Sequence, residues 1–268
     1  MGGSESAEFG FSDRVQVVDL QGEIVDSRDV IAQLKRYEDS SNVRAILLNI
    51  DSPGGGVAVS QELYTEVKRL REKKDKTIVA YMSSTGASGA YYVACGANKI
   101  IANPGTVVGS IGVIAEWINY GDLMQWAKLK EVVFKTGEFK DTGSAVRPLT
   151  DREKTYFQAL IDDMYVQFVE AVAKGRNMEI QDVRSIADGR VFTGRDAKER
   201  KLIDEIGNFQ DAIDLTAKLA GISGKPHLIQ AGRQRVTLLD VLTSDLSKVV
   251  PFSGSALKSQ IRFQYLWK

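Results

Sequence analysis

A mainly apolar run that ends directly in a glycine-rich turn is the feature that most constrains this fold. Val43–Ile50 has the composition of a strand buried on both faces of a parallel sheet. The turn Asp51–Gly56 follows at once, and the next residues, Val57–Lys74, are predicted to be a helix. A strand that passes through a tight turn into a helix is the building unit of an α/β fold.

The same order of strand, turn and helix recurs along the chain. Val15–Leu20 is predicted to be a strand, and Arg28–Asp39 the helix that follows it. Thr77–Met82 is predicted to be a third strand, followed by the polar turn Ser83–Gly86 and a helix that begins near Ala87. The sequence therefore predicts an α/β protein with a mainly parallel sheet and flanking helices.

The second half of the chain is richer in helices. Short strands are predicted at Lys99–Ala102 and Glu131–Lys135. Thr150–Glu153 has the pattern of a capping box, and an amphipathic helix over Lys154–Ala173 follows it. Three shorter helices are predicted after it, at Ile180–Ala187, Asp196–Arg200 and Phe209–Ala220.

We expect three regions along the chain. Residues 13–230 are expected to form one domain, because no internal repeat or low-complexity linker divides them. Residues 1–12 resemble an expression tag or a disordered arm, and they lack the charged and apolar regions of a signal peptide. Residues 231–268 form a basic, aromatic tail, for which we expect a flexible or partner-docked state, or weak contact with a membrane surface.

Composition excludes several classes of function. The one cysteine, Cys95, excludes a disulfide framework and a cysteine-cluster zinc site. The one histidine, His227, excludes a multi-histidine metal site, and a Ser-His-Asp triad would have to use it. With 35 basic and 35 acidic side chains, the charge gives no support for a nucleic-acid partner. No stretch approaches the roughly 18 consecutive apolar residues that span a bilayer.

The turn Pro53–Gly56 has two interpretations. Backbone without side chains can approach a ligand closely and present N–H groups at the start of a helix, where an oxyanion would be stabilised. The turn is not a P-loop, since no Gly-Lys-Ser/Thr follows it. The alternative is that the glycines only permit a tight connection between strand and helix.

Ser88 is a candidate nucleophile. It lies in Gly86-Ala87-Ser88-Gly89-Ala90, which misses the G-x-S-x-G pattern at its last position. Small neighbours leave room for a substrate carbonyl, and the N–H of Gly89 lies where an oxyanion donor belongs. The alternative is that Ser88 is only the N-cap of a helix.

A serine nucleophile needs a base, and the near absence of histidine points to lysine. A lysine acts as a base only when it is neutral, and burial can lower its pKa from about 10.4 toward roughly 7–8. His227 is far along the chain, on a predicted late strand, and we expect a structural role for it. Lys140 lies in a glycine-flanked loop, but composition alone does not distinguish it from other lysines.

Several motifs in a fixed order resemble the signal peptide peptidase A family of serine proteases, peptidase family S49, in its short single-repeat bacterial form. The resemblance extends from about Val15 to Leu219. It rests on the following segments: Asp51–Gly55, Ala87–Ala94, Gly109–Val113, Lys135–Lys140, Arg147–Thr150 and Asp188–Gly194 with Ala197.

The resemblance implies a fold similar to the Clp protease and crotonase superfamily and a Ser/Lys dyad. Ser88 matches the family nucleophile and Lys140 its general base, while Ser110 matches a serine that orients the lysine. Gly55 and Gly89 match the oxyanion-hole loops. Ala90 departs from the usual Ala-Ser-Gly-Gly, which leaves the Gly89 N–H unaffected. No metal and no cofactor are expected.

The resemblance also implies substrates, partners and location. The expected substrates are released signal peptides and similar hydrophobic, unfolded peptides. The family forms homo-oligomers in which the lysine of one subunit reaches the serine of its neighbour. We expect the bacterial cell membrane as the location, with the catalytic domain on the extracytoplasmic side and an anchor that is not part of these residues.

Two other functions remain as alternatives. A crotonase-like acyl-CoA enzyme also uses glycine-loop oxyanion holes, but it would not need Ser88 as a nucleophile. A non-catalytic scaffold at the membrane is disfavoured, because every residue of the dyad is present. A weaker hypothesis concerns the tail, whose apolar and aromatic residues could enter an active site as a self-substrate or a plug.

Overall fold

The computed structural model describes residues 14–73, 76–230 and 262–267. The described residues divide into two compact units. The first unit contains residues 14–73, 76–112, 166–230 and 265–267, and the second contains residues 113–165 and 262–264. Residues 1–12 and most of the predicted tail lie outside the described residues, and the assignment of 13–230 to one domain stays a prediction.

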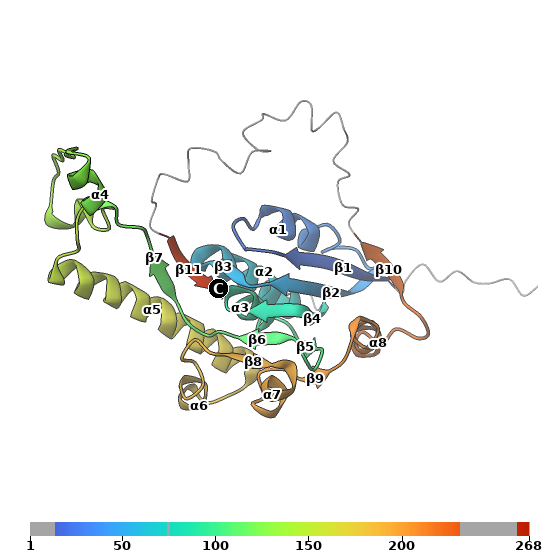
Figure 1. Cartoon of the computed structure of the whole chain (residues 1–268). Coiled ribbons are helices and arrows are strands. Elements are labelled where there is room, and N and C mark those ends of the chain that lie inside the picture. Colours follow the sequence, from blue (N-terminus) through green and yellow to red (C-terminus); the bar gives the residue numbers. More distant parts are fainter. Residues whose placement is uncertain (1–13, 74–75, 231–261, 268) are drawn as a thin grey trace, which may run out of the picture. The chain divides into compact units, whose positions relative to one another are not determined.

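The first unit is built on an eight-stranded sheet (Figure 1). Its strands are β1 (Arg14–Gln21), β2 (Val43–Ser52), β4 (Thr77–Ala87), β5 (Lys99–Ala102), β6 (Val107–Gly109), β8 (Val191–Thr193), β9 (Glu205–Ile206) and β10 (His227–Gln230). The main order is β10-β1-β2-β4-β5-β9, and β6 pairs with both β4 and β8. Every pairing except β6 with β8 is parallel, which confirms the predicted α/β class with a mainly parallel sheet.

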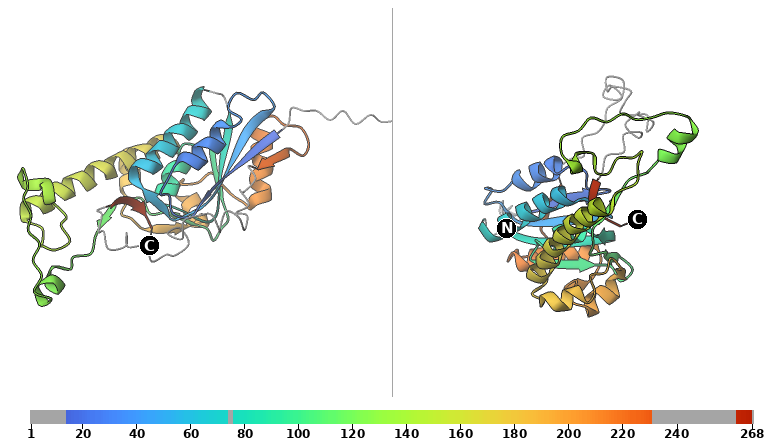
Figure 2. Two further views of the ribbon diagram at one scale, coloured as in Figure 1. Left: turned by 90° about the horizontal axis from the view of Figure 1, so that it is seen from above. Right: turned by 90° about the vertical axis from the view of Figure 1, so that its left-hand side faces the viewer.

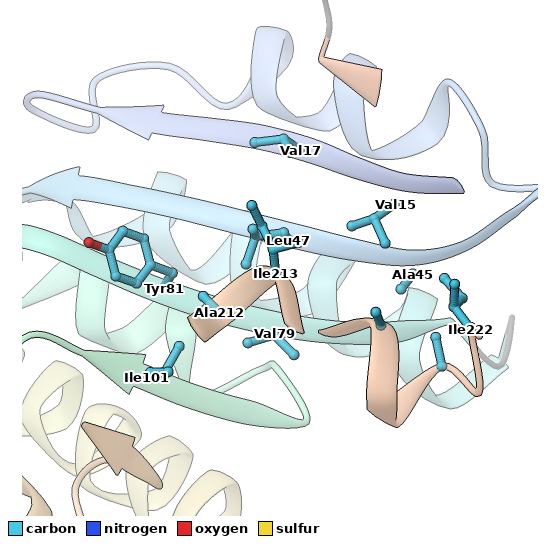
Figure 3. Packing of buried hydrophobic residues seen from close by; sticks show 12 residues of the cluster. Val15, Val17, Ala45, Leu47, Val79, Tyr81, Ile101, Ala212, Ile213 and Ile222 are labelled. Carbon is cyan, nitrogen blue, oxygen red and sulfur yellow. The ribbon is translucent and has the colours of Figure 1, made fainter. Parts of the chain in front are cut away.

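Helices cover both faces of this sheet, with α1 and α2 on one face and α8 on the other (Figure 2). The helices of the first unit are α1 (Arg28–Lys35), α2 (Val57–Lys73), α3 (Gly89–Ala94), α6 (Ile180–Arg184), α7 (Gly194–Glu199) and α8 (Phe209–Leu219). Leu47 packs toward α8 (Figure 3). Alternate residues of a strand point to opposite faces, so Ile46 and Leu48 are buried on the other face of the sheet. Burial on both faces explains the apolar composition of this strand.

The second unit is less regular. It contains β7 (Ile114–Glu116), α4 (Gly121–Trp126) and the 3₁₀ turn η1 (Glu138–Asp141). The long helix α5 (Asp151–Arg176) begins here and continues into the first unit. Two further strands, β3 (Gly54–Gly56) and β11 (Arg262–Leu266), form a three-stranded sheet with β7 in the order β3-β11-β7.

Most predicted elements are confirmed, and several boundaries move. The capping box at Thr150 and Glu153 is present in both directions. The helix after β4 begins at Gly89 and not near Ala87, because β4 continues to Ala87. Helix α1 ends at Lys35, four residues before the predicted end, and α6 ends at Arg184.

One predicted strand is wrong. Glu131–Lys135 has no regular structure, although Val132, Val133 and Phe134 have high β-propensity. All three side chains are exposed, Phe134 by 96%. A strand is stable only when a neighbouring strand completes its hydrogen bonds and one face is buried, and this segment has neither.

The core position of Leu47 yields a stability prediction. Leu47 is 0% exposed, and we expect Leu47→Ala to lower the free energy of unfolding by about 2–5 kcal/mol, because it removes buried methyl groups and leaves a cavity. Leu123→Ala is the matched control, since Leu123 is 62% exposed and should change stability by less than about 0.5 kcal/mol. Urea denaturation followed by circular dichroism measures both values, and equal losses would contradict the assignment of the core.

Candidate active site

Ser88 lies at a sharp turn between a strand and a helix. Strand β4 ends at Ala87 and helix α3 begins at Gly89, so a single residue connects them. Ser88 has φ 54° and ψ −119°, a conformation that costs a residue with a Cβ atom about 1–3 kcal/mol. The sequence misses the G-x-S-x-G pattern, yet the backbone has the strained strand-to-helix turn that this pattern normally produces.

The simple capping interpretation of Ser88 is not supported. Ser88 occupies the N-cap position of α3, but its side chain makes no capping hydrogen bond. The residue is 1% exposed, and its backbone is fixed on both sides. Its N–H donates to the Gly109 carbonyl at 2.7 Å, and its carbonyl accepts from Tyr92 N–H at 2.9 Å. The strained conformation is therefore held by strand and helix hydrogen bonds rather than by the hydroxyl group.

The glycine turn forms strand β3, Gly54–Gly56. Its backbone packs closely against the backbone of the serine turn, which is the turn at Ser88 and Gly89. A Cβ atom added at Gly54, where φ is 99°, would lie 2.6 Å from the Gly89 nitrogen. A Cβ atom added at Gly89 would lie 2.4 Å from Ser60 Oγ and 3.2 Å from the Gly55 nitrogen. Neither position has room for a side chain. The two glycine-rich turns that the sequence singled out are thus parts of one site.

The amides of β3 have different partners. Gly54 N–H donates to Ser52 Oγ at 3.1 Å, and Gly56 N–H donates to the Ile24 carbonyl at 2.9 Å. Ile24 N–H in turn donates to the Gly54 carbonyl at 2.8 Å, which fixes the plane of the turn. The Gly55 amide lies between these two anchored amides and close to Gly89, as a backbone oxyanion donor must.

Ser110 lies at the same end of the sheet as Ser88. Ala87 pairs with Gly109 in the parallel β4–β6 ladder, so Ser88 and Ser110 each follow directly after a paired residue. Ser110 is 7% exposed and also has a positive φ, of 51°. Its N–H donates to the Arg190 carbonyl at 2.9 Å. Ser110 is therefore a second buried serine with a rigid, strained backbone next to the first.

Lys140 lies in the second unit, whereas the four other predicted site residues lie in the first. It is exposed and belongs to the turn η1. The structure thus brings together Ser88, Ser110 and the two glycine turns, and it places Lys140 on a separate compact unit.

A network of charges anchors the turn that contains Lys140. Arg147 contacts Asp141 at 2.9 Å and Glu153, in the first turn of α5, at 2.5 Å. Glu153 also accepts from Thr142 Oγ1 at 3.0 Å, and Lys135 is paired with Asp141. Three of these five side chains, Lys135, Arg147 and Glu153, lie in segments that the sequence pattern marked, but only the folded chain shows that they hold the lysine turn.

The network changes the acid–base properties of its carboxylates. Hydrogen bonds from Arg147 and then from Lys135 lower the pKa of Asp141 to about 2. A hydrogen bond from Arg147 likewise holds the pKa of Glu153 well below its ordinary value, against the opposing effect of burial. Both carboxylates are therefore ionised at neutral pH and stay paired with Arg147.

Cys95 and His227 do not fit this site as a nucleophile and a base. Cys95 is buried, and burial raises the pKa of its thiol to about 12, so it does not form a reactive thiolate. His227 is exposed at the start of β10, which is separated from β4 by β1 and β2. Because it pairs with Arg14 at the start of β1, it lies at the opposite end of the parallel sheet from Ser88.

Within residues 14–73, 76–230 and 262–267, no group of three or more His, Cys, Asp or Glu side chains is arranged to hold a metal ion. Among the same residues, no helix has both the length and the apolar character needed to cross a bilayer.

Comparisons with known proteins point to one family. The family model of peptidase family S49 matches residues 70–223, which include Ser88, Ser110 and Lys140. A Synechocystis protein whose name describes a protease is 45% identical over 193 residues, covering 72% of this chain and 69% of that protein. An Enterococcus faecium relative named for signal peptide peptidase SppA is 37% identical, covering 71% of this chain and 55% of the relative.

A plant relative is more distant and much longer. The chloroplastic serine protease SPPA of Arabidopsis thaliana is 32% identical over 232 residues, covering 85% of this chain but 34% of the relative. This chain therefore spans between about one third and two thirds of the length of most of these relatives. The family match and these relatives confirm the resemblance seen in the motifs, and the chain belongs to peptidase family S49, the family of the signal peptide peptidase A proteases.

Proposed function

We propose that this S49 serine protease is an endopeptidase that uses Ser88 as its nucleophile and Lys140 as its general base. The observation that carries the proposal is the backbone of Ser88, strained between β4 and α3 with its hydroxyl group not used as a cap. Strain of this kind persists where the surrounding structure fixes it for function. The glycine turn that packs against Gly89 supplies the second half of the site.

The proposed mechanism begins with proton transfer. Neutral Lys140 accepts the proton of Ser88 Oγ as this oxygen attacks the carbonyl carbon of a peptide bond. The N–H groups of Gly55 and Gly89 then donate to the oxyanion, and each such donor is worth about 3–4 kcal/mol in other serine hydrolases. Because both amides belong to rigid, closely packed turns, they need no reorganisation when the charge develops.

In the second half of the reaction, Lys140 acts first as a general acid and then again as a general base. Protonated Lys140 donates its proton to the leaving amine, and the same lysine then activates a water molecule that hydrolyses the acyl-enzyme. Ser110 is proposed to orient the lysine by a hydrogen bond during both steps. In support, Ser110 is buried and directly follows β6, the strand that pairs with β4, one residue beyond the level of Ala87.

The proposed assembly is a homo-oligomer in which the lysine turn of one subunit serves the serine of a neighbour. Placement of Lys140 and Ser88 in different compact units is compatible with such sharing. The proposed substrates are released signal peptides and similar unfolded, hydrophobic segments, and the proposed location is the bacterial membrane with the catalytic domain outside the cytoplasm. One relative is named for signal peptide peptidase SppA, which supports this substrate class.

Replacement of the nucleophile is the first test. We expect Ser88→Ala to reduce cleavage of an unfolded protein such as casein by roughly 10⁴-fold or more, because no acyl-enzyme can form. Ser84→Ala is the matched control, since Ser84 is an exposed serine of the same strand and should leave the rate unchanged. A serine-directed fluorophosphonate should label Ser88 in peptide mapping. Label on another residue, or full activity of Ser88→Ala, would refute the assignment and readmit a crotonase-like function.

Replacement of the base is the second test. We expect both Lys140→Ala and Lys140→Arg to abolish casein cleavage, because arginine keeps the positive charge but does not deprotonate. Lys154→Ala is the control, since Lys154 is a surface lysine paired with Asp151 in the same unit. Mixing Lys140→Ala with Ser88→Ala protein should restore part of the activity. Failure of mixed oligomers to recover any cleavage would contradict a shared site.

The pH dependence of cleavage is the third test. Activity should rise toward alkaline pH, because only the neutral form of a lysine accepts a proton and the ordinary lysine pKa is about 10.4. The measurement is kcat/KM for a peptide substrate across pH, with His227→Ala as the control that should leave the profile unchanged. A profile governed by an ionisation near about 6.5, which His227→Ala removes, would make histidine the base.

A further inference from the structure

The two carboxylates nearest to Lys140 in the sequence are paired with other cations. Glu138 and Asp141 belong to the same turn η1 as the lysine. Arg152 of α5 pairs with Glu138 at 2.7 Å, and Arg147 pairs with Asp141 at 2.9 Å. In the part of the chain that the structure describes, the amine of Lys140 itself has neither an ion-pair partner nor a hydrogen-bond partner.

Ion pairs between such close neighbours form elsewhere in this chain. Arg71 pairs with the following residue, Glu72, at 2.9 Å, and Asp26 pairs with Arg28, two residues later. The carboxylate one residue after Lys140 and the one two residues before it have these same spacings. Each of them is therefore close enough to pair with the lysine when no other cation holds it.

Arg147 is the residue that holds the nearer of these two carboxylates. Its guanidinium group donates to Asp141 through Nε at 3.1 Å and through Nη2 at 2.9 Å, a bidentate geometry that binds a carboxylate strongly. The same group donates through Nη1 to Glu153 at 2.8 Å. Glu153 is 1% exposed and also accepts from Thr150 N–H at 2.8 Å and Thr142 Oγ1 at 3.0 Å. The position of the arginine is thus fixed by a buried carboxylate.

The other charges near this turn belong to the same compact unit. Lys135 is a second cation on Asp141, and Lys130 and Glu131 line an open cavity together with Asp141 and Arg147. Helix α5 contributes one cation and one carboxylate in its first turn, both paired as described. A carboxylate that is freed close to an ammonium group favours its charged form and raises its pKa. The neutral fraction of the amine then falls.

We propose, on the basis of the function proposed above, that Arg147 is a positioning residue of the active site, which occupies the Asp141 carboxylate so that Lys140 stays unpaired and available as the base. Hydrogen bonds from Arg147 and then from Lys135 lower the pKa of Asp141 to about 2, so its carboxylate is charged at any pH at which the enzyme works. Arg147 itself exchanges no proton, because a guanidinium group stays charged. It acts on the reaction through the charge beside the lysine.

The pH profile of kcat/KM tests this proposal. Arg147→Met frees the Asp141 carboxylate, and the rise of activity toward alkaline pH should move to higher pH by about 0.5–1 unit, which lowers kcat/KM about 3- to 10-fold below the rise. Arg147→Lys keeps one charge without the bidentate geometry and should move it less. Adding Asp141→Asn to Arg147→Met removes the freed charge and should return the rise to the wild-type pH. Arg28→Met is the matched control, since it removes an arginine paired with Asp26 in the other unit and should leave the profile unchanged.

The reactivity of Lys140 provides a second measurement that needs no activity. Only a neutral amine is acetylated by acetic anhydride, so labelling of Lys140 at a series of pH values, read by peptide mapping, follows its neutral fraction. The pH of half-maximal labelling should rise in Arg147→Met and return to the wild-type value when Asp141→Asn is added. Arg28→Met should match the wild type.

The outcomes separate this proposal from the function on which it rests. A loss of kcat/KM by the same factor at every pH in Arg147→Met, with labelling of Lys140 unchanged, would mean that Arg147 only stabilises the fold. The proposal would then be overturned and the protease assignment would stand. The same conclusion follows if Asp141→Asn restores neither the profile nor the labelling. If Lys140→Ala keeps its activity, Lys140 is not the base and both proposals are overturned.

Discussion

The backbone contact between the glycine turn and the serine turn is the constraint on which the rest of the site depends. Gly54 and Gly89 approach so closely that a Cβ atom at either position would overlap the other turn or Ser60. The parallel register of β2 with β4 shifts between Ile50 and Ser52, and this shift brings the end of β2 opposite Gly86. Sheet register, glycine content and the strained Ser88 are therefore parts of one arrangement, and a change in any of them would separate the amides from the nucleophile.

Local patterns predicted the elements of the central sheet well, because burial on both faces leaves a clear apolar signature. Strand β5 begins and ends at the predicted residues. Strand β2 begins at the predicted Val43 and continues two residues beyond the predicted end at Ile50. The same reasoning failed at Glu131–Lys135, where Val132 to Phe134 resemble a strand but have no neighbour to pair with. Composition reports the propensity of a segment, whereas a strand also needs a partner that is fixed elsewhere in the chain.

At the candidate site, too, local sequence patterns predict single residues, whereas the contacts between distant residues are seen only in the structure. The sequence singled out Ser88 and the glycine turn separately, because each follows a predicted strand, whereas the contact between them is seen only in the structure. The contacts of Arg147 with Asp141 and Glu153 join residues that are six positions apart on each side, across a turn whose conformation no periodicity indicates. The packing of Tyr265 on Tyr92 joins residues that are 173 positions apart in the sequence, and neither residue carries a local signal for it.

The surroundings of Lys140 set a condition on the chemistry. A lysine acts as a base only when neutral, and water around an ammonium group favours the charged form. Lys140 is exposed within its own unit, and the carboxylates of Glu138 and Asp141 flank it in the same turn. Arg147 offsets the charge of Asp141, and Arg152 is paired with Glu138 at 2.7 Å, so the turn does not surround the lysine with unpaired negative charge. For the proposed role of Lys140 as the base, groups from outside its own turn have to exclude water from the amine, and a site shared with a neighbouring subunit, as proposed above, would supply such groups.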